Sequence, residues 1–147
     1  MIVLIDRCLE FHPSYARGWF LSGALRVDAG QPDIAIEHVE RSLRLSPRNR
    51  LGAHYSVMGT AHLFRRRFED AAPLLLIAIQ EHPRHPFPYW LLASCYAHMG
   101  LLGEARGIVE RLRAITPCLI PTATPYRNPE HRELLLSGLR LAAGEAV

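Results

Sequence analysis

The stretch YWLLASCYAHMGLLGEARGIVERLRAITP, residues 89–117, decides the fold. Its apolar residues recur at three- and four-residue intervals on both sides of Gly100. That spacing is typical of two amphipathic helices, and glycine commonly ends the first of such a pair. The stretch closes at Pro117, a residue that cannot continue a helix. It therefore predicts a helix-turn-helix unit.

The same unit recurs along the chain. Four prolines that end successive segments are separated by 34, 36 and 34 residues: Pro13, Pro47, Pro83 and Pro117. Three alanines keep the same rhythm, 36 and 34 residues apart: Ala35, Ala71 and Ala105. A fixed interval of this length indicates a repeat protein. Because one unit cannot bury its apolar face alone, the core should come from stacking about three of them.

From Ala16 to about Pro117 the sequence resembles the tetratricopeptide repeat family. The matching positions are Trp19, Gly23, Ala35, Val39, Ser42 and Pro47, then Tyr55, Met58, Gly59, Ala71, Leu75, Ala78 and Pro83, then Tyr89, Leu92, Ala93, Tyr96, Ala105, Val109, Leu112 and Pro117. The sequence departs from the family pattern at Ser22, Arg26 and His62. The resemblance implies an all-α solenoid, a right-handed superhelix of three repeats, in which the recurring small residues let helix axes cross closely.

We expect one domain over residues 1–147. Its expected parts are the second helix of an incomplete repeat (1–13), three repeats (16–49, 52–85 and 86–119), a Pro-rich connector (120–128) and a capping helix (129–143). In the first part, one apolar face should meet the first full repeat and a second should lack cover; the residues concerned are Ile2, Val3, Ile5, Cys8 and Leu9. This predicts either a missing upstream domain or a homodimer through this helix.

The C-terminal end departs from the repeat. Asn128 is a helix cap, Pro129 suits the first helical position and Glu130 suits the first turn. The helix should run to residue 143 and stop at Gly144. Its apolar stripe should cover the last repeat as a solvating cap, through Leu135, Leu136, Leu139 and Ala143.

This end is also similar to the C-terminal end of repeat regions in bacterial class III adenylate or guanylate cyclases and winged-helix regulators. The similar residues are the Pro-Tyr-Arg-Asn-Pro-Glu core, 125–130, and the Gly-Leu-Arg-Leu-Ala ending, 138–142. The resemblance implies a regulatory role. It leaves an alternative open, in which the chain is the detached C-terminal part of a cyclase or transcriptional regulator.

The family resemblance implies that the first helices of the repeats line a concave groove that binds an extended peptide. By register, the groove positions are Arg17, Phe20, Ala24, Val27 and Asp28, then Ala53, Ser56, Thr60, Leu63 and Phe64, then Phe87, Trp90, Ser94, Ala97 and His98. Arg17 and His98 are the only cationic candidates, which argues against a clamp for a C-terminal carboxylate. The aromatic positions either offer stacking and apolar pockets to a partner or are covered by the C-terminal helix or a neighbouring subunit.

Charge and hydropathy exclude other classes of protein. The net charge is +3, from 17 Lys+Arg against 14 Asp+Glu, and scattered charge of this size does not favour nucleic-acid binding. The sequence contains no stretch typical of a membrane span or a signal peptide, so we expect a cytoplasmic protein. Arg65-Arg66-Arg67 is either a solvated inter-helix turn or a patch for an acidic partner.

We expect no enzyme activity, metal or cofactor. The three cysteines, Cys8, Cys95 and Cys118, lie in different elements, and Cys95 should pack as a small hydrophobic residue. The eight histidines show no ligand spacing. Pro73 interrupts a helical pattern, which predicts either a late helix start with Asp70 as its cap or a kink.

Overall fold

The computed structural model describes residues 1–48 and 52–144, a part of the chain that contains α-helices and no strand. The helices are α1 (Ile2–Phe11), α2 (Ala16–Asp28), α3 (Pro32–Leu45), α4 (Gly52–Phe64), α5 (Phe68–Glu81), α6 (Pro86–His98), α7 (Leu102–Arg113) and α8 (Pro129–Ala142). Within the described ranges, none of them has both the length and the hydropathy to cross a lipid bilayer. The predicted end of the first repeat at residue 49 lies outside the described residues.

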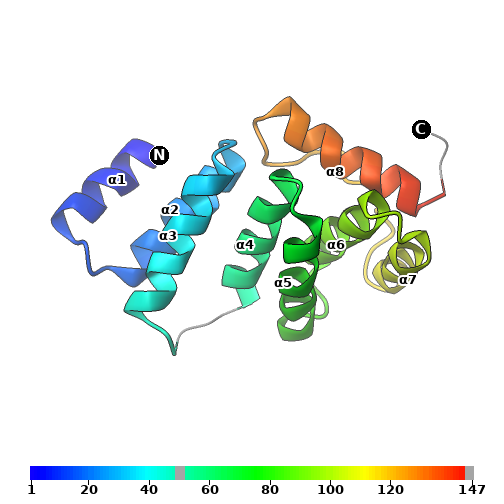
Figure 1. Ribbon diagram of the computed structural model, residues 1–147, viewed down its shortest axis with the longest axis horizontal. Helices are drawn as coiled ribbons and strands as arrows, with labels where there is room; N and C mark the ends of the chain where they lie inside the picture. The colour runs from blue at the N-terminus through cyan, green and yellow to red at the C-terminus, as the bar shows by residue number, and fades with distance from the viewer. Residues whose placement is uncertain (49–51, 145–147) are drawn as a thin grey trace.

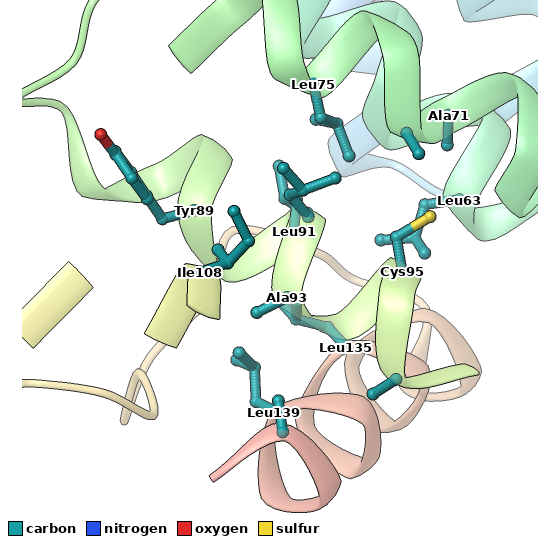
Figure 2. Close-up of a cluster of buried hydrophobic side chains, with 14 of the residues drawn as sticks. Leu63, Ala71, Leu75, Tyr89, Leu91, Ala93, Cys95, Ile108, Leu135 and Leu139 are labelled. Carbon is teal, nitrogen blue, oxygen red and sulfur yellow. The ribbon is translucent and has the colours of Figure 1, made fainter. Parts of the chain in front are cut away.

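Three helix pairs build the molecule. α2 packs on α3, α4 on α5 and α6 on α7, and neighbouring pairs meet where α3 contacts α4 and α5 contacts α6. Figure 1 shows these pairs following one another along the length of the molecule. The buried side chains form one cluster that continues from pair to pair, as Figure 2 shows for Leu75 of α5 and Leu91 of α6. The predicted all-α solenoid of helical repeats is confirmed.

Small residues let the two helices of a pair approach closely. A Cβ atom built on Gly23 would lie 2.5 Å from Cγ2 of Val39, and one built on Gly59 would lie 2.7 Å from Cγ of Leu75. The three alanines that recur with the repeat have no exposed surface: Ala35, Ala71 and Ala105. A larger side chain at these positions would force the axes apart, because the interior is already close-packed.

The turn inside each pair needs one residue in the left-handed conformation. Gly30 has φ = 87° and Gly100 has φ = 78°, as expected where glycine follows a helix. Arg66 takes the same place in the middle pair with φ = 59°. The arginine run therefore replaces the glycine of the other two turns, at the cost of a backbone conformation that suits glycine better.

Pro73 lies inside α5, so the predicted late start of that helix is wrong. The helix begins at Phe68, and the backbone amides of Asp70 and Ala71 both donate to the carbonyl oxygen of Arg67. Burial of Ala71 and its neighbours holds this first turn in place. Pro73 is exposed, so its ring meets no core side chain; its cost comes from the missing backbone hydrogen bond and from crowding of the Glu69 carbonyl by the ring.

Two departures from the family pattern form a polar link between α1, α2 and α3. The Nη2 atom of Arg26 lies 2.6 Å from both carboxylate oxygens of Asp6. Ser22 is fully buried and is hydrogen-bonded to Nδ1 of His38 at 2.8 Å. The residues of the first repeat that depart from the family pattern thus help to hold α1 against it. No such partner explains His62, whose buried Nδ1 atom is unpaired among the described residues.

α1 buries one side and exposes the other. Leu9 packs in the core, and Ile2, Ile5 and Cys8 are half-buried against the first pair. The large apolar residues on the other side are exposed to between 72% and 85%: Met1, Val3, Leu4 and Phe11. Val3 therefore belongs to the uncovered face.

α8 starts where predicted and packs on the last helix pair, but part of its buried face differs from the prediction. The side chain of Asn128 accepts a hydrogen bond of 2.9 Å from the backbone amide of Glu130, which confirms the cap. α8 packs chiefly on α6 and only slightly on α7, and in Figure 1 it runs crosswise to the helix pairs. Its buried face comprises His131, Leu134, Leu135, Gly138, Leu139 and Ala142. The predicted stripe was partly wrong, since Leu136 and Ala143 are only half-buried.

Candidate partner-binding groove

The predicted groove residues lie on α2, α4 and α6 and divide into two strips and a set of core residues. Those in the N-terminal halves of the three helices are exposed or half-buried, and we call them the open strip: Arg17, Phe20, Ala53, Ser56, Phe87 and Trp90. Those near the C-terminal ends contact residues that follow Pro117, and we call them the covered strip: Asp28, Thr60, Phe64, Ser94 and His98. Ala24 is half-buried between the strips, and Val27, Leu63 and Ala97 belong to the core.

The cover is the chain's own C-terminal segment, residues 118–144. Within the connector part of this segment, Tyr126 is buried, at 2% exposure. Its ring centroid lies 4.6 Å from that of Phe64 in an edge-to-face arrangement. The Tyr126 hydroxyl interacts with the Thr60 side chain, which itself donates to the carbonyl oxygen of Ser56 at 2.7 Å. Burial strongly raises the pKa of Tyr126, and Thr60 only partly opposes that rise, so the hydroxyl stays protonated.

Next to Tyr126, the segment reaches back to the first helix pair. The backbone amide of Arg127 donates to the carbonyl oxygen of Asp28 at the end of α2, at 2.8 Å. Burial raises the pKa of the Asp28 carboxyl, and the positive charge of Arg127 opposes that rise. The connector therefore contacts α2 and α4 before α8 begins.

α8 completes the cover over α6. The carbonyl oxygen of Leu134 accepts hydrogen bonds from Ser94 Oγ at 3.2 Å and from His98 Nε2 at 2.6 Å. Because a carbonyl oxygen only accepts, Nε2 of His98 carries a proton. One turn earlier, the ring of His131 stacks on that of Phe64 at 4.4 Å, and burial lowers the pKa of His131. The alternative in which the C-terminal helix covers groove aromatics thus holds for Phe64.

In the described part of the chain, the open strip is covered only at its α6 end. Arg17 is exposed and has neither a hydrogen bond nor an ion pair with a described residue. Phe20 packs against His54 at 4.4 Å. Phe87 packs against Trp90 at 5.7 Å and lies 6.1 Å from Tyr126, and Trp90 Nε1 donates to the carbonyl oxygen of Cys118 at 3.2 Å, so both residues border the C-terminal segment while remaining half-exposed. A cavity of about 160 Å³ opens beside Ala53 and Ser56, between the start of α4 and the start of α6. The strip can therefore offer aromatic surface, one cation and a small cavity to a segment lying along it.

The arginine run occupies the turn after α4, as predicted. Arg65 and Arg67 both pair with Asp33 of α3, at 3.0 and 3.2 Å, and all three side chains are about half exposed. Ion pairs this exposed add little stability. Arg66 has no ion pair within the described residues and lines a cleft of about 430 Å³ next to the start of α8.

The described residues do not assemble a metal or nucleophile site. No group of three or more His, Cys, Asp and Glu side chains in residues 1–48 and 52–144 is placed to hold a metal ion. Cys95 is fully buried, as predicted for a small hydrophobic residue, and its Sγ atom lies 3.2 Å from the carbonyl oxygen of Phe68. Burial raises the pKa of the Cys95 thiol to about 12, so it stays protonated and inert.

The comparisons with known proteins agree with this geometry. Residues 57–117 match the family model for the tetratricopeptide repeat. The chain has a tetratricopeptide-repeat (TPR) fold. Solved structures of similar fold include MamA, with a TM-score of 0.71, 21% identity and coverage of 97% of this chain and 85% of that one. The TPR protein YrrB, described as having an unusual peptide-binding site, gives a TM-score of 0.67 at 22% identity, with coverage of 97% of this chain and 75% of that one.

A third TPR structure, TTC0263 of Thermus thermophilus, gives a TM-score of 0.66 at 20% identity and covers 97% of this chain and 73% of that one. At such identities the likeness concerns the fold alone. No curated protein sequence matches the chain significantly.

Proposed function

We propose that this TPR chain is a non-catalytic protein-interaction module that binds a segment of a partner protein along the open strip. One observation carries the proposal: the face that α2, α4 and α6 share already holds a polypeptide segment, residues 118–144, on the strip beside it. A surface that accommodates one segment through aromatic and backbone contacts is suited to a second one alongside. Arg17 and the half-exposed rings of Phe20 and Trp90 supply the side chains for this contact.

The comparisons support this proposal at the level of the class of protein. TPR proteins are generally non-catalytic scaffolds, and the structure of YrrB is described as containing a peptide-binding site. We further propose that the interaction is regulatory and takes place in the cytoplasm, because residues 125–130 and 138–142 resemble the C-terminal end of repeat regions in bacterial cyclases and regulators.

The test is to select peptides by display against the intact chain and to measure their affinity for variants. Ala53→Arg fills the open strip and Arg17→Glu reverses its one free cation; both residues are exposed, so neither change disturbs the core. We expect each variant to weaken binding at least about tenfold, which corresponds to about 1.4 kcal/mol. Gln80→Arg, on the exposed face of α5, is the matched control and should bind normally. Equal binding by all three variants would reject the open strip as the site.

A further inference from the structure

The C-terminal segment contacts the groove in the way a bound peptide would. Tyr126 is the anchor, with its ring between Phe64 of α4, at 4.6 Å, and Phe87 of α6, at 6.1 Å. Three residues later α8 begins, and Figure 2 shows Leu135 and Leu139 of α8 lying against the α6 side of the core. A buried aromatic anchor and an apolar helix face are two common means by which a segment binds a groove.

The polar contacts between α8 and α6 use the α8 backbone. Ser94 and His98 both donate to the carbonyl oxygen of Leu134, an atom that any helix could offer. The groove therefore distinguishes one helix from another by the shape of the helix surface and not by these hydrogen bonds. A Cβ atom on Gly138 would come 2.8 Å from Cα of Ser94 and 2.9 Å from Nε2 of His98, so this position admits glycine only.

α8 is attached to the molecule differently from the paired helices. Each of α2 to α6 packs on its pair partner and on a neighbouring pair, whereas α7 and α8, at the end of the stack, both pack mainly on α6. Residues 114–128, which join α7 to α8, contain no helix. α8 can therefore leave the stack without separating any helix pair.

We propose that residues 118–144 are a tethered ligand of the covered strip and that the partner of this strip is an amphipathic helix that replaces α8 on α6. Such a helix carries leucine-type side chains in the spacing of Leu134, Leu135 and Leu139, a glycine at the place of Gly138, and an aromatic residue shortly before it starts. This inference goes beyond the proposed function, because it assigns a second binding surface, the covered strip, with its own partner chemistry and regulation. The covered strip stays closed until a helix of this kind displaces the segment.

The tether sets the condition for displacement. A short linker gives the attached segment an effective concentration of about millimolar, so a free helix with the same contacts competes poorly at lower concentration. Cutting the connector removes this advantage without changing any contact in the groove. The apparent affinity for a free helix should then rise by about 10²–10⁴-fold.

The experiment uses the full chain with a protease site built at Thr122 and Ala123, which are exposed, and cleaved after folding. The probe is a fluorescent peptide of residues 124–144, followed by anisotropy. We expect the probe to exchange with the cleaved fragment in a 1:1 complex and to bind about 10²–10⁴-fold more tightly than to the uncleaved chain. A Gly138→Leu probe should not bind. A Glu133→Ala probe, altered at an exposed residue, is the matched control and should bind normally.

Two results would overturn the proposal. One is a loss of helical circular dichroism from residues 1–121 when the fragment leaves, because α8 would then be a structural part of the fold. The other is a cleaved chain that stays folded but never exchanges its fragment for the probe. Ala53→Arg in the same cleaved chain should leave probe binding unchanged, so failure of the open strip and failure of the tethered ligand give different results.

Discussion

Gly138 of α8 lies directly on Ser94 of α6. A Cβ atom at Gly138 would overlap Ser94 Oγ and come 2.8 Å from Ser94 Cα, so the two helices meet backbone to backbone at this crossing. The closeness allows Ser94 Oγ to reach the carbonyl oxygen of Leu134. A glycine in mid-helix, which by itself weakens a helix, is therefore required by the contact between the groove and its cover.

Gly138→Ala should lower the free energy of unfolding by about 1–3 kcal/mol, because the added methyl group overpacks the crossing. The matched variant is Gly107→Ala, in α7, where an added Cβ atom would meet nothing within 4 Å. That change should stabilise the protein by about 0.5–1 kcal/mol through helix propensity. Urea unfolding followed by circular dichroism measures both. Equal effects of the two variants would show that the crossing is not tight.

Arg66→Gly should stabilise the chain by about 1 kcal/mol, since arginine at φ = 59° bears the left-handed penalty that glycine avoids. The reverse change, Gly100→Ala, should destabilise it by a similar amount. An added Cβ atom at Gly100 meets nothing within 4 Å, so its effect reports backbone conformation alone. Thermal unfolding of both variants checks the pair, and a destabilised Arg66→Gly protein would contradict the assignment.

Much of the fold could be predicted from the spacing of prolines and small residues, because these residues recur at regular intervals. The interval of 34 to 36 residues located the paired helices, and Asn128-Pro129 located the start of α8. The run Arg65-Arg66-Arg67 could also be assigned to a turn between helices. That Arg66 is the residue with the left-handed conformation is identified by the structure.

The cover over the groove could not be predicted in the same way. The apolar stripe of α8 predicts that the helix covers the last repeat, but it does not tell whether α6 or α7 receives it. Tyr126 lies in a Pro-rich connector without periodicity, and its insertion beside Phe64 is decided by tertiary contacts. Ser22 and Arg26 could be recognised as departures, but their partners Asp6 and His38 are identified only by the structure. Pairing across helices carries no local sequence signal.

Acidification below about pH 6.5 should destabilise the protein. Burial lowers the pKa of His131 from the value of 6.5 for a free histidine, and the neighbouring Glu130 only partly opposes this shift. The unfolded chain therefore takes up the proton first as the pH falls. Stability contributed by neutral His131 is complete above pH 6.5 and is lost below it. Burial acts in the same direction on His38 and His62.

The variant His131→Phe keeps a ring against Phe64 and removes the titrating group. Between pH 7.5 and 5.5 it should therefore lose less stability than the wild type, by urea unfolding at each pH. An unchanged pH dependence would mean that His131 takes no part in it.

α1 should mediate self-association, because Met1, Val3, Leu4 and Phe11 expose apolar surface side by side on one helix. Leu4→Arg should convert a dimer at high protein concentration into a monomer, measured by light scattering after gel filtration. Leu102→Arg is the matched control, an exposed leucine on α7 far along the stack. The Leu102→Arg variant should still form the dimer. A wild-type chain that remains monomeric at high concentration would remove α1 as an interface.

The hydroxyl of Tyr126 should contribute to stability through Thr60 specifically. Tyr126→Phe removes the hydroxyl and keeps the ring, so it should cost about 0.5–1.5 kcal/mol. Thr60→Val removes the side-chain hydroxyl that Tyr126 interacts with and also its bond to Ser56, and should cost more. In the double variant the losses should be less than additive, with a coupling of at least about 0.5 kcal/mol, because the second change removes an interaction already lost. Tyr15→Phe, at an exposed tyrosine, should change nothing. Strictly additive losses would mean that the two side chains stabilise the connector independently and that the connector is held by ring burial alone.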